Sequence, residues 1–247
     1  MAWVKGELLD SLAEADRLGA EQLSRAAQPS LFDRLDWLKR VWAHTPPAPR
    51  LLVARAQRER GFAWLFLAID DQKRALGLSN WYNFSTHPIF AGEADDAARR
   101  AMLVAIARRL KPGLGRITIS PMAEADAELM QSAFSKAGWF ATSHQCSTRW
   151  IAHVKDKNFA TYWDERPGQL RNTFKRKSGK SEIVCTVFTS FDEAAWDAYE
   201  AVYAQSWKPE EGSPAFLRDM AMSESEAGCL RLAVARMDGE PVAAQLW

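Results

Sequence analysis

The spacing of apolar residues predicts two helices at the start of the chain. Residues 6–27 carry leucines among interspersed acidic and basic residues, which is typical of an amphipathic helix. A second helix is predicted to begin at Ser30, a favourable N-cap with Asp33 three residues later, and to end before the proline-rich run 45–49. We expect residues 1–28 to form a helical extension ahead of the first folded unit.

The apolar pattern then changes to that of strands. Three short apolar runs, separated by charged or glycine-containing turns, predict an antiparallel meander over Leu51–Ala56, Phe62–Ile69 and Ala75–Asn80. Beyond them the pattern alternates between helix and strand, with elements predicted over residues 94–110, 116–120, 124–136 and 139–154. Gly138 stands where the second of these helices should end. Together these elements predict one α/β unit over residues 29–154.

Residues 155–247 repeat this alternation. The pattern predicts helices over residues 159–163, 168–178, 190–206 and 214–225, and strands over 182–188, 230–237 and 241–247. Asp238-Gly239 is a hairpin signal between the last two strands. Leu170 and Phe174, four residues apart on a helix, are expected to face a core. Because Trp247 lies within an apolar strand with no turn after it, we expect this second unit to be incomplete and the chain to be truncated.

Composition narrows the class of protein without naming a function. Of the 247 residues 47% are hydrophobic and 26% charged, which is the composition of a globular protein. The formal net charge of +1 gives no reason to expect DNA or a membrane surface as a partner, and no apolar stretch approaches the ~20 residues of a membrane span. Three scattered cysteines without a CxxC pair favour a reducing compartment, so we expect a cytoplasmic protein. His144 and Cys146 alternate, but two ligands do not make a zinc site, and we expect no metal.

The strongest chemical signal is the basic run from Arg166 to Lys180. Six of its residues are basic and none is acidic. On a helix, Arg171, Lys175 and the neighbouring Arg176 would form a stripe whose positive field favours phosphate or diphosphate groups. The alternative is a solvated helix face without a ligand.

Aromatic residues supply two further candidate sites. Trp196, Tyr199, Tyr203 and Trp207 follow one another at helical spacing, and the first two are expected to pack into a sheet. Trp207 and Lys208 fall beyond the helix end, where an aromatic ring beside a cation suits sugar stacking and phosphate pairing.

The other candidate is the mixed run 81–88, which contains Trp81, Tyr82 and His87. The histidine there is either a structural residue or a general base. No catalytic residue can be assigned from these patterns, because no nucleophile elbow, P-loop or paired carboxylates accompany them.

A strand, an Asp-Gly turn and a second strand, preceded by two helices, resemble the opening half of an acyltransferase domain of the GNAT family. Residues 230–247 resemble its second and third strands, and residues 129–139 the helix that closes such a domain. Tandem GNAT units with a basic helix between them resemble the Fem-type peptidyltransferases and the CelD-like acyltransferases of bacterial polysaccharide loci. The closest local matches are residues 170–177 and 206–208.

The resemblance implies an α/β (α+β) fold of tandem GNAT-like units, with mostly antiparallel mixed sheets flanked by helices. It implies direct N- or O-acyl transfer, without a covalent enzyme intermediate, from acetyl-CoA or another acyl-CoA. The acceptor would be a small molecule or glycan precursor of the cell envelope or of polysaccharide synthesis. Residues expected to bind the acceptor or a phosphate are Trp81, Tyr82, Arg171, Lys175, Arg176, Trp207 and Lys208.

The family's pyrophosphate loop, Q/R-x-x-G-x-G/A after the fourth strand, is not matched. The nearest string, residues 110–115, begins with leucine. We therefore expect the acyl-CoA site beyond residue 247 and residues 1–247 to be inactive alone. Two other functions stay open. One is a non-catalytic GNAT-like module that binds a nucleotide-sugar or a partner of a polysaccharide assembly. The other is a Fem-type peptidyltransferase that uses aminoacyl-tRNA, which the short basic run and low net charge disfavour.

Overall fold

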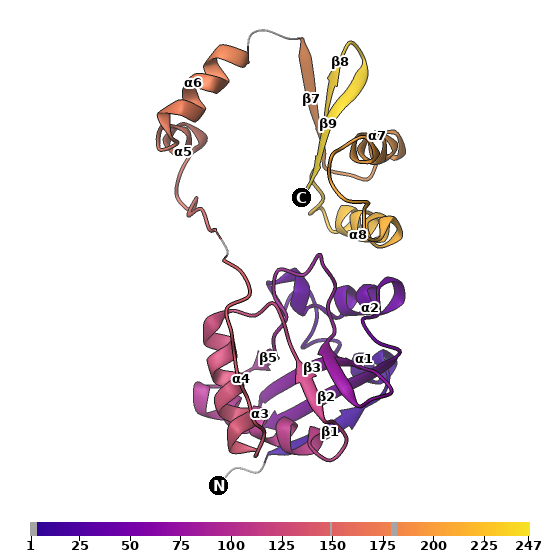
Figure 1. Ribbon diagram of the computed structural model, residues 1–247, viewed down its shortest axis with the longest axis vertical. Helices are drawn as coiled ribbons and strands as arrows, with labels where there is room; N and C mark the ends of the chain where they lie inside the picture. The colour runs from indigo at the N-terminus through magenta and orange to yellow at the C-terminus, as the bar shows by residue number, and fades with distance from the viewer. Residues whose placement is uncertain (1–3, 149, 179–181) are drawn as a thin grey trace. The chain divides into compact units, whose positions relative to one another are not determined.

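The computed structural model describes residues 4–148, 150–178 and 182–247. The chain divides into two compact units, Met1–Ser147 and Thr148–Trp247, each with its own sheet. Helices and two mostly antiparallel sheets make up a mixed α/β structure, which confirms the predicted fold class (Figure 1).

The sheet of the first unit has six strands. They are β1 (Lys5–Leu9), β2 (Arg50–Arg58), β3 (Gly61–Ile69), β4 (Arg74–Gly77), β5 (Ile89–Gly92) and β6 (Arg116–Thr118). The order is β1-β2-β3-β4-β6, and β5 pairs with the first half of β3. All pairs are antiparallel except β4 with β6. The predicted meander of β2, β3 and β4 is therefore confirmed.

Strand β3 is apolar from Phe62 to Ile69 because helices cover both faces of the sheet. On one face Leu65 and Leu67 belong to a core shared with α3 (Asp96–Leu110) and α4 (Glu124–Lys136). On the other face the ring of Trp64 meets α1 (Leu12–Gly19). The 3₁₀ turn η1 (Leu31–Asp33) and α2 (Leu35–His44) follow α1 along the chain.

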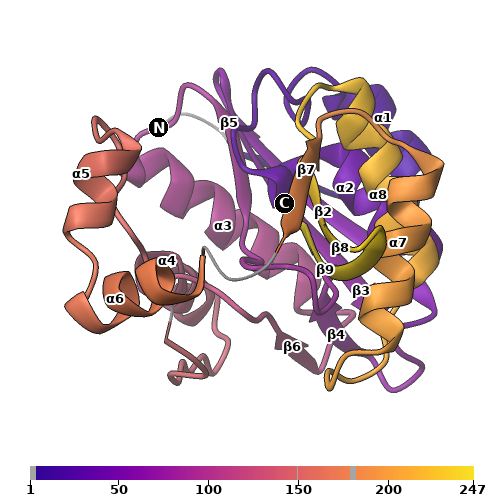
Figure 2. The same ribbon diagram turned by 90° about the horizontal axis from the view of Figure 1, so that it is seen from above.

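The second unit contains a helical pair and a three-stranded sheet. The helices are α5 (Phe159–Asp164) and α6 (Gly168–Lys177), and the sheet has the order β7 (Ile183–Phe188), β8 (Leu232–Met237), β9 (Glu240–Leu246). Between β7 and β8 the chain forms α7 (Glu193–Ala204) and α8 (Pro214–Glu226), both on one side of the sheet (Figures 1 and 2). Among the described residues, no helix is long and apolar enough to cross a membrane.

The two units repeat one topology. In each, a strand is followed by two helices, a second strand antiparallel to the first, and a two-residue hairpin to a third strand. The hairpins close at the pairs Arg58–Gly61 and Met237–Glu240. Leu9 pairs with Val53 and Phe188 with Leu232, so the same number of residues separates the partners in both units.

Two helical predictions at the N-terminus are wrong in detail. Residues 6–27 do not form one helix: β1 occupies the first part and pairs with β2, and only Leu12–Gly19 are α-helical. Glu7 of β1 lies opposite Arg55 and forms an ion pair with it, so a charged strand is stabilised by its partner. The helix expected from Ser30 is a 3₁₀ turn followed by α2.

Three other expectations are corrected farther along. The strand predicted over 139–154 is irregular in its described residues, because it has no partner strand there. Leu170 and Phe174 are exposed on a helix that has no buried residue, and Phe174 packs on Trp163 of α5. The helix expected over residues 190–206 is α7, which begins at Glu193 after its N-cap Asp192.

Replacing Gly19 by alanine should destabilise the first unit. An added Cβ would lie 2.5 Å from the ring of Trp64, which is fully buried and donates through Nε1 to Gln22 at 3.0 Å. The clash should outweigh the usual benefit of alanine in a helix and cost about 1–3 kcal/mol of unfolding free energy. Equilibrium denaturation of Gly19→Ala would measure this. Gly115→Ala is the control, since an added Cβ there meets nothing within 4 Å.

Candidate functional site

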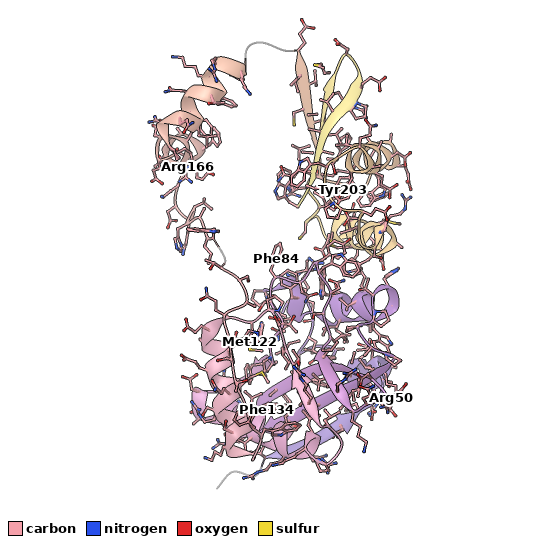
Figure 3. The ribbon with its side chains drawn as sticks, viewed as in Figure 1. Arg50, Phe84, Met122, Phe134, Arg166 and Tyr203 are labelled. Atoms are coloured by element: carbon pink, nitrogen blue, oxygen red, sulfur yellow. The ribbon has the colours of Figure 1, made fainter. Side chains whose placement is uncertain are left out.

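The second unit contains a cavity of about 440 Å³ lined by α7, α8 and their connecting loop. We call it the α7–α8 cavity. Figure 3 labels Tyr203, one of the residues that line it. Its lining comprises Trp196, Tyr199, Glu200, Tyr203, Ala204, Lys208, Pro209, Glu210, Glu211, Pro214 and Leu217. The volume falls in the range of small-molecule sites, roughly 300–1,000 Å³.

Local structure determines how α7 presents its aromatic residues. Asp192 caps the helix by accepting from the backbone N–H of Ala195 at 2.8 Å. Trp196, Tyr199 and Tyr203 then recur at helical spacing on one side, with ring centroids 5.2 and 6.2 Å apart along the row. Trp196 is 1% exposed and anchors this row, as expected from its spacing. At the far end of the loop Ser213 caps α8, with Pro214 in the first turn.

Hydrogen bonds join these rings to the polar groups of the cavity. The Trp196 indole donates to Glu200 Oε1 at 2.8 Å, and the Tyr199 hydroxyl donates to Glu211 Oε2 at 3.3 Å. The Tyr203 hydroxyl donates to the backbone oxygen of Pro209 at 3.2 Å. Partial burial, and then the nearby Glu211 carboxylate, raise the pKa of Tyr203. Its phenol therefore stays protonated and remains a donor at neutral pH.

The charges that line the cavity are mostly negative. Glu200, Glu210 and Glu211 contribute carboxylates, and Lys208 contributes the one ammonium group among the lining residues. Lys208 Nζ lies 5.7 Å from the centroid of the Tyr203 ring, within cation–π range. Trp207, predicted to act with Lys208, is 92% exposed and does not line the cavity.

The sequence pattern missed Glu200 and Glu211 as candidate binding residues. Glu200 stands four residues after Trp196, a spacing that places the two side chains on one side of a helix. Glu211 lies in an acidic loop whose fold brings it back to α7 through Tyr199. The Trp196–Glu200 contact could have been predicted from the spacing of the two residues. The Tyr199–Glu211 contact could not, because it depends on the path of the loop.

The predicted basic stripe lies on α6, away from any cavity described here. Arg171, Lys175 and Arg176 are exposed, and Arg171 lies 3.7 Å from the Asp164 carboxylate of α5. Lys180 lies outside the described residues. The cations of the last turn also stabilise the helix by facing its negative end. This arrangement suits both the anion-binding and the solvated-face interpretations.

Stacked rings support this helical pair. Trp163 stacks on Phe159 within α5, with centroids 5.9 Å apart, and contacts Phe174 of α6 edge-on at 5.1 Å. The guanidinium of Arg166 lies 4.3 Å from the centroid of Tyr162 (Arg166 is labelled in Figure 3). Arg166 is thus engaged within the pair, and the accessible cations are those of α6.

The other predicted candidates, Trp81 and Tyr82, belong to the first unit. Their rings contact each other at 5.5 Å in the loop after β4, and Trp81 is largely exposed. The same loop is fastened to the fold by Asn83, which is buried and whose Oδ1 accepts from the Trp37 indole at 3.2 Å. The structure therefore offers, on an anchored loop, an aromatic pair of which Trp81 is exposed and Tyr82 half-buried.

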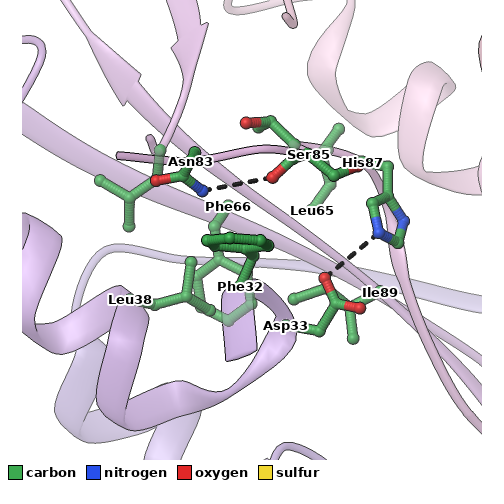
Figure 4. Close-up of a pocket in the computed structure, with 11 residues that line it drawn as sticks. Phe32, Asp33, Leu38, Leu65, Phe66, Asn83, Ser85, His87 and Ile89 are labelled. Atoms are coloured by element: carbon green, nitrogen blue, oxygen red, sulfur yellow. Dashed lines mark hydrogen bonds and ion pairs between the residues drawn. The ribbon is translucent and has the colours of Figure 1, made fainter. Parts of the chain in front are cut away.

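His87, at the end of this loop, is held between two carboxylates. Its Nε2 lies 3.2 Å from Asp33 (Figure 4), and its Nδ1 lies 3.9 Å from Asp126 of α4. The adjoining cavity measures about 10 Å³, room for about one water molecule, so it admits no substrate. The hydrogen bond to Asp33 raises the pKa of His87 and outweighs the opposing effect of burial. This geometry supports the structural interpretation of His87.

Within the described ranges, no group of three or more histidine, cysteine, aspartate or glutamate side chains could hold a metal ion. The three cysteines are exposed and free of disulfides.

Comparison with known proteins adds one finding. Residues 168–247 match the family model described as an acetyltransferase (GNAT) domain. The matched range begins at the first residue of α6 and includes every element from there to β9. This stretch is similar to a GNAT-type acetyltransferase domain, which supports the GNAT superfamily and a general acyltransferase function. No curated protein and no solved structure gave a match.

His87 should stabilise the first unit more in acid than in alkali. Because its pKa is raised in the folded state, its contribution is complete below the unfolded value of 6.5 and is lost as pH rises through the folded value. The substitution His87→Gln should therefore cost more unfolding free energy at about pH 5.5 than at about pH 8.5, by on the order of 1 kcal/mol. Denaturant titrations at the two pH values would measure the difference. An equal cost at both would contradict it, and the exposed His153 supplies a control variant, His153→Gln.

Proposed function

We propose that this protein is a GNAT-type acyltransferase built from two GNAT-like units. One observation carries the proposal: the strand–helix–helix–hairpin of β7 to β9 lies inside the range that matches a GNAT acetyltransferase domain. The same order in β1 to β3 supports a tandem arrangement of the Fem-like or CelD-like kind. The donor in this proposal is acetyl-CoA or another acyl-CoA.

The first unit is poorly suited to hold an acyl-CoA pyrophosphate. A GNAT domain binds that group after its fourth strand, where helix N–H groups are open to the anion. In the first unit the helix after β4 and β5 is α3, and the carboxylate of Asp95 already accepts from the Ala98 N–H at 2.7 Å. Glu93 and Asp96 flank this end with further negative charge. The acids would repel a pyrophosphate, so we assign the first unit a role other than donor binding.

The partial motif at residues 110–115 does not replace the missing loop. It follows the C-terminal end of α3, where exposed carbonyl groups disfavour an anion. Lys111 in this string donates to the backbone oxygen of Gly138 and so fastens α3 to the end of α4. The string is therefore a structural connection.

The proposed reaction is direct transfer to an acceptor related to the cell envelope or to polysaccharide synthesis, in the cytoplasm. Direct transfer depends on positioning the acceptor more than on a nucleophilic side chain. In this proposal Arg171, Lys175 and Arg176 contact an anionic part of the donor or acceptor. The exposed Trp81, beside the half-buried Tyr82, offers a stacking surface. The three cysteines form no disulfide in the part of the chain that the structure describes, and such cysteines suit a reducing compartment.

Residues 1–247 should bind acetyl-CoA more weakly than micromolar. The reasons are that α3 of the first unit presents acids where a pyrophosphate would need open N–H groups, and that the described sheet of the second unit has three strands whereas the loop follows a fourth. Calorimetric titration of residues 1–247 with acetyl-CoA measures this directly. Micromolar affinity would contradict the expectation and would point to a pyrophosphate site elsewhere in these residues.

The substitutions Arg171→Ala and Arg176→Ala should lower transfer without lowering stability. A lost charge-assisted contact costs about 1–3 kcal/mol of binding, or roughly five- to 150-fold in kcat/KM, whereas an exposed charge adds little to folding. Release of CoA from acetyl-CoA by the natural protein, followed chromatographically with candidate acceptors, gives kcat/KM.

Lys155→Ala is the control, an exposed cation of the same unit outside α6. Unchanged kinetics in the arginine variants would establish α6 as a solvated face. A complete lack of acceptor-dependent CoA release would contradict acyl transfer itself.

A further inference from the structure

We propose that one end of the first unit docks on the anionic surface of a lipid bilayer. This end carries six exposed cations, which we call the basic surface: Arg50, Lys73, Arg74, Arg108, Lys111 and Arg116. The inference goes beyond the proposed function and does not depend on acyl transfer.

Strand register brings three of these arginines together. Arg50, Arg74 and Arg116 are the first residues of β2, β4 and β6. Arg50 pairs with Ile69, the last residue of β3, and Arg74 pairs with Arg116. Because β4 begins where β3 ends, all three arginines lie at the same end of the sheet.

A turn and a helix end contribute the other cations. Lys73 lies in the β3–β4 turn, where its backbone oxygen accepts from the N–H of Gly115 at 3.0 Å, just before β6 begins. Lys111, four residues before Gly115, is the C-cap of α3, and Arg108 lies one turn earlier on the same side of the helix. The cations therefore come from several neighbouring elements that end together.

Most of this positive charge is not compensated by acidic residues of the chain. Residues 97–123 contain six basic residues and no acidic one. The β3–β4 turn contains Asp70 and Asp71, and Asp70 Oδ2 lies 2.7 Å from Nε of Arg74. Within the described ranges, no other cation of the basic surface forms an ion pair. Arg116 and Arg74 are directly opposite each other, and such like charges repel unless an anion neutralises them.

An exposed aromatic ring lies beside the basic surface. Phe140 is 95% exposed, although the chain is fastened on both sides of it. The Trp139 indole donates to a backbone oxygen of α3 at 2.9 Å, and the backbone oxygen of Ala141 accepts from an amide side chain of α4 at 3.1 Å. Lys111 donates to the backbone oxygen of Gly138, two residues before Phe140. Cations around an outward ring suit a bilayer interface, where headgroup phosphates meet the cations and the ring enters the acyl boundary.

A bilayer fits these features better than a single phosphate ion or a nucleic acid. Helices α3 and α4 both end here, and the carbonyl groups of helix ends disfavour an anion held close to the backbone. Long cationic side chains instead reach outward to a layer of headgroups. Single-stranded nucleic acid is held along a groove by successive stacked rings, whereas Phe140 supplies one ring at the margin of the basic surface.

Co-sedimentation of the full chain with lipid vesicles tests the proposal. At low ionic strength we expect binding to vesicles of equal parts phosphatidylglycerol and phosphatidylcholine, and binding roughly tenfold weaker or less to phosphatidylcholine alone. The double substitution Arg108→Gln and Arg116→Gln should weaken binding roughly 25-fold, or about fivefold for each cation.

A matched pair of substitutions controls for net charge. Arg60 and Arg99 are exposed and belong to the opposite end of β3: Arg60 precedes its first residue, and Arg99 lies over Phe90 of β5, which pairs with the start of β3. Arg60→Gln with Arg99→Gln removes the same charge and should change binding by less than about twofold. An equal loss in the two double variants would overturn the proposal, and so would equal binding to the two kinds of vesicle.

The exposed ring gives an independent test. Phe140→Ser should weaken vesicle binding roughly tenfold, whereas Trp150→Ser, at an exposed ring of the second unit, should not. All these side chains are exposed, so melting temperatures should be unchanged. Binding of polyuridylate through Arg108 and Arg116, without binding of anionic vesicles, would reject the bilayer in favour of a nucleic acid. Because no acyl donor is present, none of these results bears on the proposed acyl transfer.

Discussion

Each unit depends on one constraint. Its central strand must pair antiparallel both with the strand before it and with the strand after it in the sequence. The two-residue hairpins at Arg58–Gly61 and Met237–Glu240 fix one side of that pairing. The other side requires the chain to leave the first strand, form two helices and return in register. The connecting helices must therefore end close to the sheet, and their loop must turn back over them. The α7–α8 cavity lies where this return occurs in the second unit.

The connection from the first strand to the central strand has the same topology in the two units but is packed differently. In the first unit the segment after α1 is packed into the fold: Leu23 is buried, and Gln28 donates to the backbone oxygens of Gln22 and Phe90. In the second unit the corresponding loop contributes charged residues, including Lys208 and Glu211, to an open lining. One topology thus gives a packed connection in one unit and a hollow in the other. The difference arises from side chains in the loop and not from the order of strands.

Much of this fold could be predicted from local pattern, and the failures have physical causes. Gly138, at positive φ, ends α4 where the sequence places it, and Asp238-Gly239 forms the expected turn. Strand β1 escaped prediction because its charged Glu7 resembles a helix surface until Arg55 of the partner strand is known. Residue 140 and those after it alternate like a strand, yet Phe140 is exposed because pairing needs a partner that pattern alone does not supply. Strand β5 was not predicted, because its four residues are too few to show the alternation that identifies a strand.

The net charge of the chain likewise did not predict the charge at the candidate site. A formal net charge of +1 is compatible with strong local fields of either sign, because it records only their sum. Within the second unit, the cations of α6 and the carboxylates around Tyr203 belong to different elements. Sequence reasoning weighed Lys208 as an isolated cation and inferred an anionic partner. The structure surrounds that lysine with acids and an aromatic face, and these carboxylates would repel the phosphate that the isolated cation suggested.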